Sequence, residues 1–244
     1  HMALFGYDPV RCEIGRGVLE ALGIGFDLRA GDVAVRLNFA TVDGEGTITD
    51  RRAGRISSEK CVELCAKLTR IELPGVELFV RPVKEHRAVA VLRGEGLAGG
   101  LNDTDPQRTG VAPLPLTPER PEQKRTAELL TLFVEKARGV LRAEPKANAV
   151  TLRGIAARER IPTFEERYRM RAAAIAEYPM YRGVAGLVGM TVLPAAEAAE
   201  AVVPMLKGVF AEFDFFFVHY KKTDSTGEDG SFEVCDLGGK WPVR

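Results

Sequence analysis

Polar and apolar residues alternate over several short stretches in the first two-thirds of the chain. Between residues 33 and 39 the apolar side chains share one face, and Arg36 and Asn38 lie on the other. This period of two is typical of a half-exposed β-strand. The same alternation predicts further strands at residues 76–83, 87–92 and 147–152. Pro82 cannot donate to a sheet ladder, so we expect its strand to lie at an edge or to carry a bulge.

Other stretches carry apolar residues every three or four positions and are expected to be amphipathic helices. One begins after a cap at Ser57 or Ser58 and turns Cys61, Leu64, Cys65 and Leu68 inward. The longest opens at Pro121, and a shorter helix covers 17–23. The stretch 94–118 is rich in Gly, Pro, Asn and Asp, and it predicts a long surface loop.

The last third follows a different pattern. Residues 213–220 are apolar apart from Asp214, which predicts a strand covered on both faces, as in a parallel sheet. Further elements are expected at 172–176, 179–188, 191–193 and 196–212, with a bend at Pro204. The sequence therefore predicts an α+β fold up to a boundary near Thr163 and an α/β fold beyond it.

The charge balance narrows the possible partners. Lys plus Arg and Asp plus Glu each number 34, so the net charge is zero. A general electrostatic nucleic-acid binder is therefore not expected, and no apolar run is long enough for a bilayer span. The cysteines are Cys12, Cys61, Cys65 and Cys235. Without a CxxC motif they are expected to be reduced core residues of a cytoplasmic protein rather than zinc ligands.

Two clusters of polar residues could carry chemistry. Asp224 and Glu228 follow the apolar strand and are spaced for a shared site for a hard divalent metal; the alternative is a solvated polar loop. Arg51, Arg52 and Arg55 precede a helix start, where guanidinium groups bind phosphate or carboxylate; the alternative is an exposed charge run. Arginines and acids at other strand ends and loops add to a possible anion site: Arg87, Arg93, Asp103, Asp105 and Arg153.

Six longer motifs occur in order along the chain. They are LFGYDP at 4–9, RLNFATVD at 36–43, DRRAGRI at 50–56, NDTDP at 102–106, AIAEYPMYRG at 174–183 and FFFVHYKKTD at 215–224. Together they resemble the archaeal-type, cofactor-independent (2,3-bisphosphoglycerate-independent) phosphoglycerate mutases. The resemblance extends from Ala3 to about Glu233.

The resemblance implies an α/β protein with an alkaline-phosphatase-like core and an inserted α+β domain that handles substrate. The expected parts are 1–30 (entering core), 31–163 (insert), 164–233 (returning core) and 234–244 (unrelated tail). It also implies interconversion of 3- and 2-phosphoglycerate in glycolysis through a phosphoserine, with two divalent ions, Mn²⁺ or Mg²⁺. The expected substrate-binding residues are Asn38, Arg51, Arg52, Arg55, Arg87, Arg93, Asp103, Asp105, Arg153 and Arg182, and the expected metal ligands are Asp224 and Glu228.

The chain departs from the family pattern at both ends. The family's opening metal motif and nucleophilic serine have no counterpart before Leu4, and its later Asp-His motif has none after Glu233. We therefore expect a truncated middle piece with no catalytic nucleophile, with its metal ions not fully bound, and with exposed strand edges prone to self-association. The alternatives are a non-catalytic phosphoglycerate-binding or structural fragment, or another phosphotransferase of the alkaline phosphatase superfamily.

Overall fold

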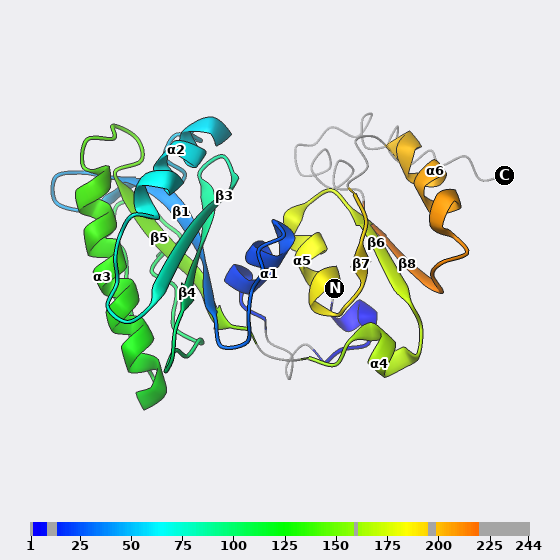
Figure 1. Cartoon of the computed structure of the whole chain (residues 1–244). Coiled ribbons are helices and arrows are strands. Elements are labelled where there is room, and N and C mark those ends of the chain that lie inside the picture. Colours follow the sequence, from blue (N-terminus) through cyan, green and yellow to red (C-terminus); the bar gives the residue numbers. More distant parts are fainter. Residues whose placement is uncertain (1, 9–13, 159–160, 195–198, 220–244) are drawn as a thin grey trace. The chain divides into compact units, whose positions relative to one another are not determined.

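The computed structural model describes residues 2–8, 14–158, 161–194 and 199–219 (Figure 1). The chain divides into two compact units. The central unit is Val10–Arg160, and the terminal unit combines His1–Pro9 with Ile161–Arg244. The division after Arg160 lies close to the boundary expected near Thr163. The assignment of these units to an insert and a phosphatase-like core stays a prediction.

The central unit is built on an antiparallel sheet, in which β5, β1, β4 and β3 are neighbours in that order and β2 pairs with the end of β1. The strands are β1 (Val33–Val42), β2 (Ile48–Asp50), β3 (Glu77–Lys84), β4 (Arg87–Arg93) and β5 (Ala149–Ala157). The expected strands and their hairpin are confirmed, although β5 is longer than predicted. Pro82 lies on the outer strand β3, where the register with β4 shifts.

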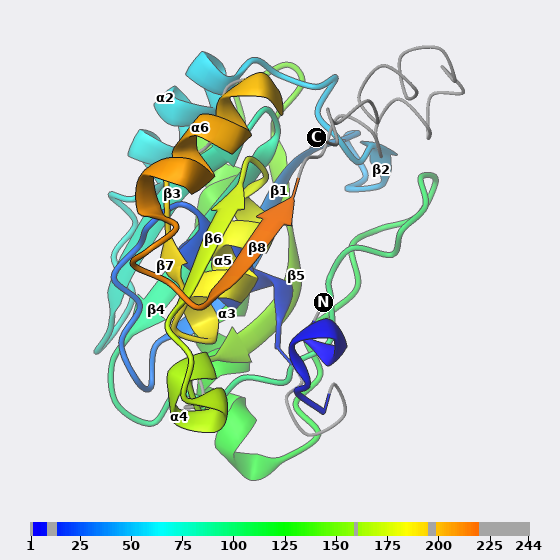
Figure 2. The ribbon, with the colours of Figure 1, turned by 90° about the vertical axis from the view of Figure 1, so that its right-hand side faces the viewer.

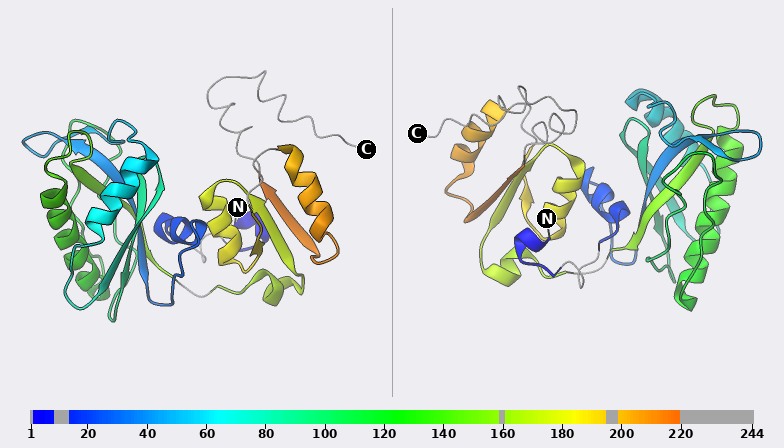
Figure 3. Two further views of the ribbon diagram at one scale, coloured as in Figure 1. Left: turned by 45° about the horizontal axis from the view of Figure 1, so that its top comes forward. Right: turned by 180° about the vertical axis from the view of Figure 1, so that it is seen from behind.

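One face of this sheet is covered by α2 (Ser58–Leu68) and α3 (Lys124–Leu141), as both views of Figure 3 show. Ser57 caps α2 by accepting a hydrogen bond from the Lys60 N–H. α3 follows a short 3₁₀ turn, η2 (Pro121–Gln123). Cys61 and Cys65 of α2 are buried in the core beneath these helices and form no disulfide, as predicted. The other two cysteines, Cys12 and Cys235, lie outside the described residues.

The other face of the sheet meets α1 (Arg16–Gly23) (Figure 1). At Gly17 the helix lies so close to the backbone of Ala34 and Val35 that a Cβ would collide with it. The expectation that the first strand is half-exposed was therefore wrong: along β1 only Arg36 and Thr41 escape full burial. Asn38, on the supposedly open face, is only 5% exposed.

The terminal unit contains a parallel sheet in which β6 (Ala172–Ala176) lies between β7 (Thr191–Val192) and β8 (Phe215–His219) (Figure 2). Its helices are α4 (Phe164–Tyr168), α5 (Pro179–Leu187) and α6 (Ala199–Val209), the last of which ends three residues before the predicted Glu212. The 3₁₀ turn η1 (Ala3–Phe5) joins this unit through a hydrogen bond from the Tyr168 hydroxyl to the Phe5 carbonyl, 2.8 Å long.

The parallel arrangement of β8 is confirmed, but its expected coverage on both faces was wrong. Each residue of β8 is only partly buried. Within the described residues β8 pairs with β6 alone, so it is an edge strand. No helix in the described part of the chain is long and apolar enough to cross a membrane.

Candidate anion-binding site

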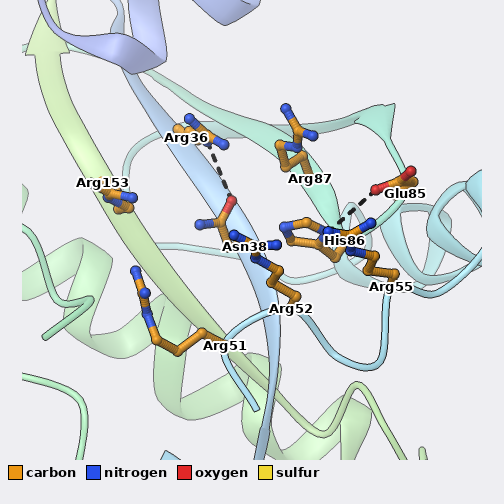
Figure 4. Close-up of a pocket in the computed structure, with 9 residues that line it drawn as sticks. All are labelled: Arg36, Asn38, Arg51, Arg52, Arg55, Glu85, His86, Arg87 and Arg153. Atoms are coloured by element: carbon orange, nitrogen blue, oxygen red, sulfur yellow. Dashed lines mark hydrogen bonds and ion pairs between the residues drawn. The ribbon is translucent and has the colours of Figure 1, made fainter. Parts of the chain in front are cut away.

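A pocket of about 380 Å³ opens on the face of the central sheet opposite α2 and α3. Six arginines line it, with one amide, one carboxylate and one imidazole (Figure 4): Arg36, Arg51, Arg52, Arg55, Arg87, Arg153, Asn38, Glu85 and His86. Its size is at the lower end of the usual range for small-molecule sites. The excess of positively charged side chains favours a small anion as the ligand of this candidate site.

Strand register brings much of this pocket together. Arg36 lies opposite Arg153 of β5, and Asn38 lies opposite Arg87 of β4. The intervening apolar residues of β1, such as Leu37, point to the core under α2 and α3. Because side chains alternate between the faces of a strand, these polar residues share the face opposite that core. The alternation noted in the sequence thus corresponds to a real division between core and site.

A tight loop presents the next two arginines. The Asp50 carboxylate accepts hydrogen bonds from the backbone N–H groups of Arg52 and Gly54, 2.7 and 2.6 Å long. Residues 53–55 all have positive φ angles, of 49°, 62° and 50°. Left-handed backbone is unfavourable at the non-glycine Ala53 and Arg55, and such strain concentrates at functional sites. The loop holds Arg52 and Arg55 at the pocket despite this cost.

Arg51 is fixed by a buried carboxylate. Its Nε and Nη2 donate to the two oxygens of Asp105, at 2.9 and 2.8 Å, and the side chain of Asp105 is only 1% exposed. Burial raises the pKa of Asp105, but the hydrogen bonds from Arg51 and from the Gln107 N–H, with the charges of Arg51 and Arg153, outweigh it and lower the pKa below its usual value. The pair is therefore ionised and pre-oriented at neutral pH.

Arg153 is held in the same way by the neighbouring acid of the same loop. Its Nε lies 3.3 Å from Asp103, and its Nη1 lies 3.7 Å from Asp105. Asp103 also accepts a 2.7 Å hydrogen bond from the Gly154 N–H. The sequence predicted Asp103 and Asp105 as substrate ligands; the structure engages both with arginines that line the pocket. Asp105 and Asp103 therefore orient Arg51 and Arg153, and a direct contact of either acid with substrate stays a prediction.

Arg52 and Arg55 differ from the clamped arginines. Within the described residues, neither guanidinium group has a hydrogen bond or ion pair, and both residues are exposed. Their positive charges are thus available to an incoming anion. The bidentate fork of each group suits a phosphate or a carboxylate.

Three residues that line the pocket, Arg36, Glu85 and His86, were not predicted as site residues, and neither was Glu20, which lies outside the lining and contacts Arg36. His86 is 7% exposed and has a pKa lowered to about 4, mainly by burial and then by the charge of Arg87. Glu20 of α1 reaches Arg36, with 3.3 Å between Oε1 and Nε, and burial raises its pKa. The only signal for Glu20 was a lone acid within a short apolar helix, and for His86 a polar residue at the turn of a hairpin.

The remaining predicted residues lie elsewhere. Arg93 is bound to the buried Asp32, with an Nη2–Oδ2 distance of 2.7 Å, and does not line the pocket. Arg182, in the terminal unit, donates to the carbonyl oxygens of Ala176 and Leu193. The predicted metal ligands Asp224 and Glu228 lie outside the described residues. Within the described part of the chain no group of three His, Cys, Asp or Glu side chains could hold a metal.

Comparison with known proteins identifies the family. The family model for 2,3-bisphosphoglycerate-independent phosphoglycerate mutase matches residues 1–147, more than half of the chain. The chain belongs to this family. The matched segment contains Asn38, the loop with Arg52 and Arg55, and the Asp103–Asp105 segment. The resemblance inferred from the sequence motifs is therefore confirmed.

Individual relatives agree with this assignment. The chain is 48% identical over 237 residues to a probable 2,3-bisphosphoglycerate-independent phosphoglycerate mutase of Thermus thermophilus, and 46% identical over 243 residues to one of Aquifex aeolicus. These alignments cover 95% and 96% of this chain but 58% and 60% of the relatives. The chain thus spans well under two-thirds of the length of these proteins.

Solved structures support the α/β fold class. A cofactor-independent phosphoglycerate mutase from Thermoplasma acidophilum is 32% identical, with a TM-score of 0.69, over 98% of this chain and 67% of its own. A Pyrococcus horikoshii protein is 26% identical, with a TM-score of 0.76, over 97% of this chain and 59% of its own.

Proposed function

We propose that the full-length protein containing this chain interconverts 3-phosphoglycerate and 2-phosphoglycerate. The observation that carries the proposal is the pair of exposed guanidinium groups, Arg52 and Arg55, beside Arg51 and Arg153. The buried Asp105 holds Arg51, and the partly exposed Asp103 holds Arg153. Phosphoglycerate carries a phosphate and a carboxylate, so it needs several fixed positive groups. Family membership favours this substrate over other small dianions.

The arginines suit a reaction that passes the phosphoryl group to a serine and then returns it to the other hydroxyl of the same glycerate. Between the two transfers the glycerate must stay bound and turn. Arg51 and Arg153 have fixed directions because Asp105 and Asp103 orient them, whereas Arg52 and Arg55 supply charge. A rigid pair holds one anionic group in a defined position, which lowers the entropic part of the barrier.

We also propose that turnover requires divalent metal ions, Mn²⁺ or Mg²⁺, with Asp224 and Glu228 among the ligands. Among the described residues no group of three His, Cys, Asp or Glu side chains could hold such ions. Oxygen ligands of this kind match hard divalent ions. A chelator should abolish turnover of the full-length protein, and Mn²⁺ should restore it; full activity in excess chelator would contradict the requirement.

For the 244-residue chain itself, the second candidate is a phosphoglycerate-binding module without turnover. The specific observation in its favour is that every residue of the pocket belongs to the central unit.

Within the cell, we propose that the full-length protein acts in the cytoplasm on this small-molecule substrate.

A coupled mutase assay with Mn²⁺ tests the proposed reaction. The full-length protein should convert 3-phosphoglycerate, and Arg52→Lys should cost about 1–3 kcal/mol in kcat/KM, because lysine keeps the charge and loses the fork. The 244-residue chain alone should show no turnover. A full-length protein inactive toward phosphoglycerate but active on another phosphate ester would favour a different phosphotransferase of the superfamily.

A further inference from the structure

His86 is the one imidazole among the side chains that line the arginine pocket. Its carbonyl is anchored by the Phe39 N–H at 2.8 Å, at the turn between β3 and β4. The side chain is more than nine-tenths buried, and its enclosed Nδ1 has no hydrogen-bond partner among the described residues. Buried polar groups in folded proteins are nearly always paired. Because Nδ1 is enclosed and faces Glu85, a ligand in the pocket can reach a polar atom of this ring only at the other nitrogen, Nε2.

The surroundings keep this ring uncharged. Arg36 of β1, Arg52 of the loop and Arg87 of β4 act against its protonation, and burial acts in the same direction. The nearest opposing group is the Glu85 carboxylate, 3.9 Å from Nδ1. With its proton on Nδ1, toward Glu85, a neutral imidazole presents the Nε2 lone pair as a hydrogen-bond acceptor.

The other side chains that line the pocket include few hydrogen-bond acceptors. Its arginines offer only N–H donors, which suit phosphate and carboxylate oxygens. The Asn38 Oδ1 already accepts from the Arg36 Nε at 3.3 Å. Glu85 is the other acceptor that lines the pocket, and its side chain is 36% exposed, so water can satisfy it.

We propose that His86 accepts a hydrogen bond from the free hydroxyl of the bound phosphorylated acid and so selects hydroxy acids over analogues without that hydroxyl. The inference rests on the proposed function, because the pocket must first bind phosphoglycerate. A site built to pair a ligand hydroxyl discriminates strongly against its absence. Because this pocket is open to solvent, we expect a preference of about tenfold rather than the much larger ratios of enclosed sites.

Isothermal titration of the 244-residue chain with two compounds provides the test. One is 3-phosphoglycerate, and the other is 3-phosphooxypropionate, which has the same charged groups and no hydroxyl. The chain should bind the hydroxy acid about tenfold more tightly. His86→Leu should remove this preference by weakening only the hydroxy acid, His86→Gln should keep part of it through its amide oxygen, and Arg70→Lys, at an exposed position outside the pocket lining, should keep the ratio.

A second measurement needs no substitution. The ¹⁵N resonance of the unprotonated ring nitrogen of His86 should shift on addition of 3-phosphoglycerate and not on addition of the deoxy compound. Equal affinities for both compounds, an unchanged preference in His86→Leu, or loss of the preference in Arg70→Lys would overturn the role of His86 and leave the proposed function standing. If the chain bound neither compound, the proposed function would fail, and this inference with it.

Discussion

At the scale of single residues, the clamp between Arg51 and Asp105 gives the pocket its fixed geometry. Asp105→Asn removes the charge and one of two acceptor positions, so Arg51 loses its bidentate partner. We expect 3-phosphoglycerate to bind the chain roughly tenfold more weakly, the scale of one charged hydrogen bond. Titration calorimetry measures this, with the exposed Asp27→Asn as a control. Unchanged affinity in Asp105→Asn would mean that Arg51 does not reach the ligand.

The low pKa of His86, about 4, makes a prediction about stability and pH. The unfolded chain takes up this proton near pH 6.5 and the folded chain only near pH 4, so stability falls as pH drops between these values. The groups that face the ring are Arg36, Arg52 and Arg87, which oppose protonation, and Glu85, which favours it. The loss should approach roughly 3 kcal/mol.

Denaturant unfolding at pH 7 and pH 4.5 measures this loss. The wild-type chain should lose stability over this interval, and His86→Gln, which has no group that titrates there, should lose less. Identical losses in the two proteins would show that the folded chain binds the proton as readily as the unfolded one.

At the scale of secondary-structure elements, the local spacing of apolar residues predicted the positions of most helices and strands. The period of two located β1, β3 and β4, and the period of three to four located α2 and α3. Burial from outside the element could not be predicted. The polar face of β1 carries α1, and β8 lies at an edge within the described sheet, so the solvent exposure of both strands was misjudged. The alternation of polar and apolar residues predicts where a strand lies, but the helices and strands that pack against it determine which of its faces are buried.

The close packing of α1 on β1 gives a test at this scale. Gly17→Ala places a methyl group against the backbone of Ala34 and Val35, and it should cost about 1–3 kcal/mol of unfolding free energy. Since α1 carries Glu20, the substitution should also weaken anion binding through Arg36. In the matched control Gly139→Ala, the methyl group meets open space in α3, and stability should stay equal or rise by up to about 1 kcal/mol. Equal stability of the two variants would contradict the close packing.

At the scale of the whole molecule, the candidate site was only partly predictable. Sequence motifs named Arg51, Arg52, Arg55, Arg87 and Arg153, which do line one pocket. Which acid holds which arginine depends on residues about 50 positions apart, such as Arg51 and Asp105. Strand pairing and loop packing make these contacts, and no local pattern encodes them. The ion pair of Arg93 could not be predicted for the same reason, because its partner Asp32 lies 61 positions away.

The central claim is that the arginine pocket of the central unit binds phosphoglycerate, and calorimetric titration of the 244-residue chain with 3-phosphoglycerate tests it most directly. One molecule should bind per chain. Arg52→Lys and Arg55→Lys should each weaken binding about five- to tenfold, because each variant loses a guanidinium fork that no group among the described residues engages. The exposed Arg70→Lys, on a different part of the unit, should bind as the wild type does. If the wild type did not bind, or if all three variants bound equally well, the pocket would be a solvated basic surface and the account would be wrong.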